Sequence, residues 1–213
     1  MTRYLFTLLF AFSAVAFGAT GNISKVNSSI SVDAGQQAGD VSTVNGSITI
    51  HEDARVRDVE TVNGSIKLHA RAQANEAETV NGDVTLAEDV LVSGNVETVN
   101  GEITLRRGAR VDGDLENVNG DFEIDGATVR GGLETTNGDV RIGAGSRVEG
   151  GLLVEKPSGW GWNHSKRLPR VTIESGAVVS GSLRFEREVE LQVASDATVG
   201  PIEGVAPKRI AER

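Results

Sequence analysis

The chain has 213 residues and a formal net charge of −9, with 30 acidic residues against 21 basic ones. It contains no cysteine, which excludes a disulfide framework and a lipid anchor attached to a cysteine side chain. The acidic balance argues against nucleic acid or an anionic membrane surface as a partner.

Residues 1–19 have the pattern of a secretory signal peptide. Arg3 precedes a short apolar run, and small residues follow it through Ala19. Small residues at Ala16 and Gly18 favour cleavage after Gly18, and cleavage after Ala16 or Ala19 also fits. The run is shorter than the about 20 apolar residues that a spanning helix needs. We therefore expect an exported protein of the periplasm or cell surface, with no membrane span after signal removal.

From residue 20 to residue 202 the sequence is built from one repeat. An asparagine with similar neighbours recurs at steps of 18 or 19 residues, at Asn27, Asn45, Asn63, Asn81, Asn100, Asn119 and Asn137. Val precedes each asparagine except the last, and Gly follows each except the first. An apolar-x-apolar pair comes shortly afterwards, as in Ile48 and Ile50. A period near 18 with such strand-like pairs is typical of repeat proteins.

Each full repeat opens with a turn and a second apolar motif. One copy reads Gly-Ala-Arg-Val-Asp-Gly-Asp-Leu over 108–115, and related units begin at Gly35, Asp53, Arg71, Asp89, Gly126, Gly145, Gly176 and Asp196. The apolar spacing within a unit fits no helix face but fits short strands separated by Gly, Asn and Asp corners. We predict an all-β fold, a single-stranded right-handed parallel β-helix (β-solenoid) of about nine coils of 18–19 residues.

The Asn-Gly corners have a physical explanation in this fold. Asn tolerates the left-handed conformation and Gly adopts positive φ without penalty, so we expect left-handed corners there. Because residues one period apart stack, the asparagine side chains should also form a hydrogen-bonded ladder along the rod. We assign this ladder a structural role.

Stacking also predicts rows of charged side chains. One row contains Glu60, Glu78, Glu97, Glu116 and Glu134, and another contains Asp83, Glu102, Asp121 and Asp139. We interpret both rows as a solvated acidic face, and divalent cation binding is the alternative. His51 and His69, with Asp33 one period before them, could hold a transition metal, or they could lie on exposed turns. No other cofactor is expected.

The repeat is interrupted once, between Gly145 and Gly176. The surplus, residues 155–170, predicts a loop leaving one corner, with candidate binding residues at Trp160, Trp162, His164, Lys166 and Arg167. Exposed Trp beside basic residues suits stacking on sugars or docking a protein partner. The alternative is a flap that buries both rings against a sheet. The last residues, 203–213, are predicted to form a flexible tail.

The Gly-Ala-x-Val-x-Gly-x-Leu strings at 108–115, 126–133 and 176–183 resemble bactofilins, polymer-forming cytoskeletal proteins of bacteria. The Val-Asn-Gly-x-Ile repeats of the first half are more similar to adhesin-like β-solenoids of bacterial envelopes. The first resemblance implies rods that join end to end without nucleotide. Bactofilins are cytoplasmic, whereas this chain begins with a predicted signal peptide.

Catalysis finds little support in the sequence, because no nucleophile–base pair can be argued from the spacing. We expect a non-catalytic structural or adhesive solenoid of the bacterial envelope, able to form a homopolymer and to contact envelope proteins or polysaccharide. The alternative is a carbohydrate-binding or polysaccharide-degrading solenoid that uses the loop with Trp160 and Trp162.

Overall fold

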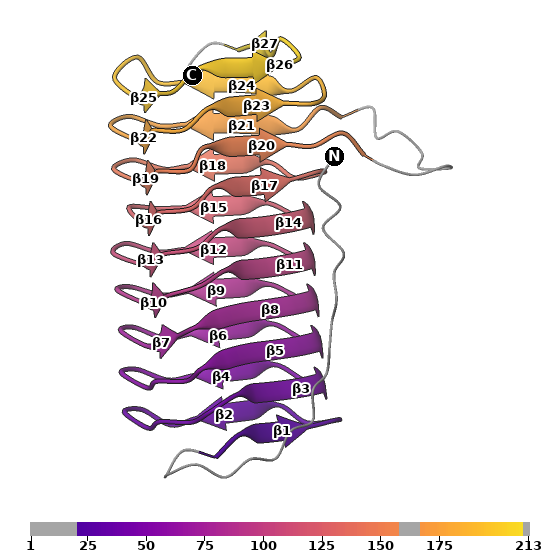
Figure 1. The fold of residues 1–213 in the computed structure, drawn as a ribbon, viewed down its shortest axis with the longest axis vertical. Coiled ribbons are helices and arrows are strands. Elements are labelled where there is room, and N and C mark those ends of the chain that lie inside the picture. Colours follow the sequence, from indigo (N-terminus) through magenta and orange to yellow (C-terminus); the bar gives the residue numbers. More distant parts are fainter. Residues whose placement is uncertain (1–20, 158–166, 211–213) are drawn as a thin grey trace.

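The computed structural model describes residues 21–157 and 167–210, and all of its regular structure there is β-strand (Figure 1). Every pairing between strands is parallel, and each strand pairs with the strand one coil away. In Figure 1 the chain passes along the near sheet, returns behind it and rises from the N-terminal to the C-terminal end, which is a right-handed coil. The predicted β-solenoid of about nine coils is confirmed. The predicted signal peptide, residues 1–19, lies outside the described residues.

Three sheets form the sides of the coil. Sheet A contains β1 (Ile23–Lys25), β3 (Val41–Asn45), β5 (Asp58–Asn63), β8 (Glu76–Asn81), β11 (Val96–Asn100), β14 (Leu115–Asn119), β17 (Leu133–Thr135), β20 (Leu152–Val154), β23 (Leu183–Phe185) and β26 (Ile202–Gly204). Sheet B contains β2 (Ile30–Val32), β4 (Ile48–Ile50), β6 (Ile66–Leu68), β9 (Val84–Leu86), β12 (Ile103–Leu105), β15 (Phe122–Ile124), β18 (Val140–Ile142), β21 (Arg170–Ile173), β24 (Glu190–Val193) and β27 (Lys208–Arg209). Sheet C contains β7 (Gln73–Ala74), β10 (Leu91–Val92), β13 (Arg110–Val111), β16 (Thr128–Val129), β19 (Arg147–Val148), β22 (Val178–Val179) and β25 (Thr198–Val199).

The core is a narrow column of aliphatic side chains inside the three sheets. Alternate residues of each strand point inward, so the apolar-x-apolar pairs of the repeat become buried pairs, as at Ile48 and Ile50 in β4. The parallel register stacks equivalent residues, and one inward column contains Ile48, Ile66, Val84, Ile103, Phe122 and Val140. Phe122 and Phe185 are fully buried in this core, and the rest of it needs only Val, Ile, Leu and Ala.

The corner conformations differ from the prediction. Most left-handed φ values belong to residues that open a repeat, for example Asp53 at 58° and Gly108 at 76°. Among the Asn-Gly pairs only Gly120 has a positive φ, and at 157° it is close to extended. At the Asn-Gly corner glycine is needed because the backbones of adjacent coils approach closely: a Cβ on Gly82 would lie 2.1 Å from the carbonyl oxygen of Gly64. The corner brings adjacent coils into backbone contact, so any side chain there would collide with the preceding coil.

Both irregular segments leave the stacking intact. The loop predicted at 155–170 departs after β20 and rejoins at β21, yet Leu152 still pairs with Leu133 and Val171 with Val140. Ordered pairing also extends beyond residue 202, further than the sequence predicted. Strand β26 pairs with β23, where Ile202 packs against the core beside Leu183, and β27 pairs with β24.

Candidate functional site

The stacked asparagines form a continuous chain of side-chain hydrogen bonds along one edge of sheet A. Each Nδ2 donates to the Oδ1 of the asparagine one coil before, at 2.8–3.1 Å, from Asn27 to Asn137. Every carboxamide between these ends therefore both donates and accepts. The ladder uses the amide groups for coil-to-coil bonding, which is a structural use.

A second ladder, which the sequence reasoning missed, lies beneath the first. The threonine two residues before each asparagine is buried and donates from Oγ1 to the carbonyl oxygen of the preceding corner, at 2.9–3.0 Å, in Thr43, Thr61, Thr79 and Thr98. Asn117 takes this place in the next coil, donating to Gly101 and Gly120 and accepting from Thr135. The recurrence of Thr at this position in the repeat was the signal that could have revealed it.

Arg187 ends the asparagine ladder from a distant part of the chain. Its Nη1 donates to Asn137 Oδ1 at 2.9 Å and to the Thr136 carbonyl at 3.0 Å. No asparagine follows Asn137 in the repeat, so the last carboxamide oxygen would lack its usual partner from the next coil. Partial burial lowers the pKa of the guanidinium. Arg187 thus joins the coils on either side of the inserted loop.

The outer face of sheet A is a dense acidic surface. The strands β5, β8, β11, β14 and β17 carry seven carboxylates and no Lys or Arg: Asp58, Glu60, Glu76, Glu78, Glu97, Glu116 and Glu134. The five glutamates predicted as a row are aligned by the strand register. We refer to these seven residues as the acidic face.

The acidic face holds carboxyl groups with raised pKa values. Desolvation raises the pKa of Glu78 to about 7, and the charges of Glu97 and Glu60 contribute to this rise. Desolvation and the charges beside them likewise raise the pKa values of Glu116 and Glu134 to about 7. Because the neighbouring charges are all negative, this face would attract protons and cations.

The second predicted acidic row has a structural role along most of its length. These carboxylates accept backbone N–H groups from the next coil: Asp83 from Glu102 at 2.9 Å, Asp121 from Asp139 at 2.7 Å and Asp139 from Arg170 at 2.9 Å. In the earlier coils a serine Oγ accepts the backbone N–H of the next coil in the same way, at Ser29, Ser47 and Ser65. The row therefore continues a ladder of side-chain acceptors along sheet B.

The candidate metal ligands do not form a three-residue site. The His51 and His69 rings are stacked, with centroids 5.1 Å apart and planes 8° apart, and His51 Nε2 shares a hydrogen bond with Ser31 Oγ at 3.0 Å. Burial and the nearby charge of Lys67 lower the pKa of His69. Within residues 21–157 and 167–210, no group of three or more His, Asp or Glu is placed to hold a metal ion, so Asp33 does not complete a site.

Of the loop candidates, only Arg167 can be placed. Trp160, Trp162, His164 and Lys166 lie outside the described residues. Arg167 is exposed and pairs with Asp139. It lines a pocket of about 320 Å³, and a pocket of about 240 Å³ adjoins it over β12, β15, β18 and β21. The base of the loop is therefore a concave, charged part of the surface.

Comparison with known proteins adds no relative. No family model, curated protein or solved structure matches the chain. No helix in the part of the chain that the structure describes is long and apolar enough to cross a membrane. Function must therefore be argued from the geometry of the rod, its ends and its faces.

Proposed function

We propose that the chain is an exported, non-catalytic rod of the bacterial cell envelope, with a structural or adhesive role, whose copies join end to end. Sheets A and B run from the first coil to the last, sheet C joins them from β7 onward, and ladders of side chains bond one coil to the next. Such a surface suits a spacer or filament, which needs length and stiffness.

The observation that carries the proposal is the unpaired strand edge at each end of sheet A. Among the described residues, β1 pairs only with β3 and β26 only with β23. The Ile23 N–H donates to the Asp40 carbonyl oxygen. Because the backbone polar groups of successive strand residues point to opposite sides, the N–H and C=O of Ser24 point away from β3. Exposed edges of this kind are templates for another strand. Both edge strands also have isoleucine at the inward position, Ile23 and Ile202, so a second copy would continue the core column.

The experiment measures mass by light scattering as the concentration of exported protein rises. Ser24→Pro removes one free N–H from the edge of β1, whereas Ser24→Ala keeps it. Wild-type protein and Ser24→Ala should grow in mass with concentration, and Ser24→Pro should remain smaller at each concentration. A wild-type protein that stays monomeric throughout would reject end-to-end joining.

The second candidate function is carbohydrate binding or cleavage through the loop with Trp160 and Trp162. The observation in its favour is the pair of adjoining pockets at the base of that loop. A glycan array probed with wild-type protein and Trp160→Ala tests it, since loss of binding in the variant would support a sugar-stacking role.

A further inference from the structure

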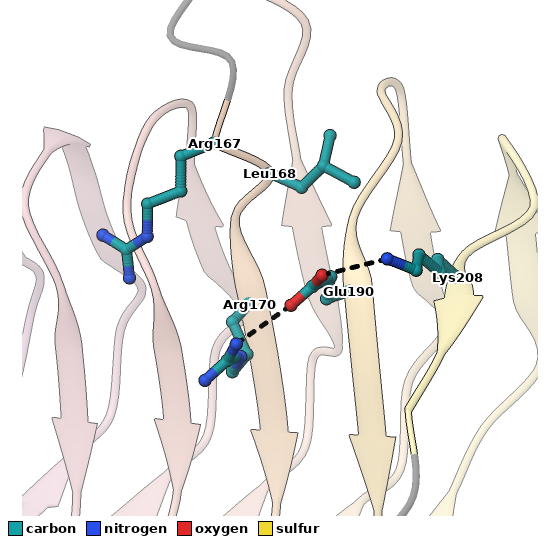
Figure 2. A pocket seen from close by; sticks show the side chains of 5 residues that line it. All are labelled: Arg167, Leu168, Arg170, Glu190 and Lys208. Atoms are coloured by element: carbon teal, nitrogen blue, oxygen red, sulfur yellow. Dashed lines mark hydrogen bonds and ion pairs between the residues drawn. The ribbon is translucent and has the colours of Figure 1, made fainter.

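The larger pocket lies between the end of the loop and the last strands of sheet B. It has a volume of about 320 Å³ and is lined by Arg167, Leu168, Arg170, Glu190 and Lys208. Figure 2 shows Glu190 between Arg170 and Lys208, with Leu168 forming another part of the wall. Three adjacent coils contribute to it, because Arg170, Glu190 and Lys208 are equivalent residues of β21, β24 and β27.

The pocket is cationic in a chain that is otherwise acidic. Arg170 Nη2 lies 3.0 Å from Glu190 Oε2, and Lys208 Nζ lies 3.3 Å from Glu190 Oε1. One carboxylate thus serves two cations, and the hydrogen bonds from both lower the pKa of Glu190. Arg167 adds a third positive charge beside Asp139. The balance of these five groups is positive by one charge, against −9 for the whole chain.

The two cations that flank Glu190 retain hydrogen-bonding capacity. A guanidinium carries five N–H donors and an ammonium carries three. Glu190 receives one side-chain hydrogen bond from Arg170 and one from Lys208. Both cations are more than half exposed, so their remaining donors can reach a ligand. A second oxyanion can therefore bind these donors, and it would compete with Glu190 for the same two cations.

We propose that this pocket binds a small acidic ligand, a carboxylate on a body of monosaccharide size such as a uronic acid. Arg170 and Lys208 would bind the carboxylate, and Leu168 would contact the apolar face of the ring. A volume near 320 Å³ is at the lower end of the range for small-molecule sites, which suits a single sugar unit. This inference goes beyond the rod function and does not depend on end-to-end joining.

Glu190 gives the proposal a distinctive test because it competes with the ligand for the same two cations. The carboxylate of Glu190 repels an incoming anion while holding Arg170 and Lys208 in place. Glu190→Gln keeps the shape of the side chain and removes its charge. If Arg170 and Lys208 bind the carboxylate of the ligand, glucuronate should bind this variant more tightly than wild type. If Glu190 itself contacts the ligand, glucuronate should bind the variant more weakly.

The experiment titrates the full chain with sodium glucuronate and, separately, with neutral methyl glucoside, following backbone amide shifts by NMR. Glucuronate should shift the amides around Leu168, Glu190 and Lys208, and methyl glucoside should not. Lys208→Ala should weaken glucuronate binding about tenfold, the loss expected for one charge-assisted hydrogen bond. Glu190→Gln should strengthen it several-fold, and Arg147→Ala, an exposed cation of sheet C, should leave it unchanged.

Three results would overturn the proposal. The first is the absence of saturable glucuronate shifts at this pocket. The second is an equal response to methyl glucoside, which would assign binding to the sugar ring alone. The third is unchanged affinity in Lys208→Ala. This variant is a sound probe because the Lys208 side chain is 61% exposed on a terminal strand and contributes nothing to the buried core.

Discussion

Replacing Glu78 by glutamine should stabilise the rod above neutral pH and have little effect in acid. Glu78 stands in the middle of the acidic face, with Glu60 and Glu97 on the adjacent strands. Burial and these charges raise its pKa from 4.5 to about 7. The folded chain therefore binds more protons than the unfolded chain between pH 4.5 and 7, so stability is highest below this window and falls as pH rises through it. The glutamine side chain of the variant cannot ionise, so the variant should lose this part of the pH dependence.

The size of the effect follows from the width of the window. A shift from 4.5 to about 7 corresponds to an upper bound of about 3 kcal/mol at high pH. The side chain is only half-buried, so water screens the repulsion and we expect about 1 kcal/mol for one substitution. In a protein of this size such a change raises the melting temperature by about 2–4 °C.

The assay is thermal melting at pH 4 and pH 8 for wild-type protein, Glu78→Gln and the control Glu88→Gln. Glu88 is exposed at a turn, and its side chain belongs to no ion pair among the described residues. Glu78→Gln should melt higher than wild type at pH 8 and equally at pH 4, while the control should match wild type at both. A Glu78→Gln variant that melts lower than wild type at pH 8 would refute the reasoning, because the ionised carboxylate would then be stabilising.

Three further predictions concern the corner and its ladder. Gly82→Ala places a Cβ 2.1 Å from the preceding coil and should cost about 3 kcal/mol or more, whereas Gly35→Ala, at φ 71° with open space around it, should cost about 1 kcal/mol; chemical denaturation measures both. Asn81→Ala removes a donor and an acceptor from the ladder and should lower the unfolding free energy by about 1–2 kcal/mol; an unchanged value would mean that water replaces the ladder. Arg187→Ala should speed hydrogen exchange around Asn137 and leave the first coils unaffected.

The sequence was enough to predict the coil and its stacking register, but not the backbone conformation of every corner. A period of 18 or 19 residues with inward pairs such as Ile48 and Ile50 determines which residues stack, and the stacked asparagines follow from it. The repeat period does not show why glycine occupies the corner. An Asn-Gly pair is compatible both with a left-handed turn and with close backbone approach. Only the distance between coils, as at Gly82, distinguishes the two.

Contacts that cross the inserted loop were also beyond sequence reasoning. Arg187 is 50 residues from Asn137, with the insertion between them, so the period of 18 or 19 residues does not link them. The pocket formed by Arg170, Glu190 and Lys208 was missed for a different reason. Lys208 lies in residues 203–213, which the sequence predicted to be a flexible tail, so no strand was expected beside Glu190.

The amide and threonine ladders are confined to the N-terminal half of the rod, whereas the pocket proposed to bind a ligand lies in the C-terminal half. From Asn27 to Asn137 the amide and threonine ladders bond each coil to the next, and the side chains at that corner are fully engaged. Beyond Asn137 the amide ladder ends, and the coils are joined by aliphatic stacking and ion pairs such as Arg170–Glu190, which also occur in the first half, as at Arg71–Asp53. Exposed ion pairs add little stability, but they can exchange one partner for a ligand at small cost. The regular half therefore suits a rigid spacer, and the half with the loop and pocket suits recognition.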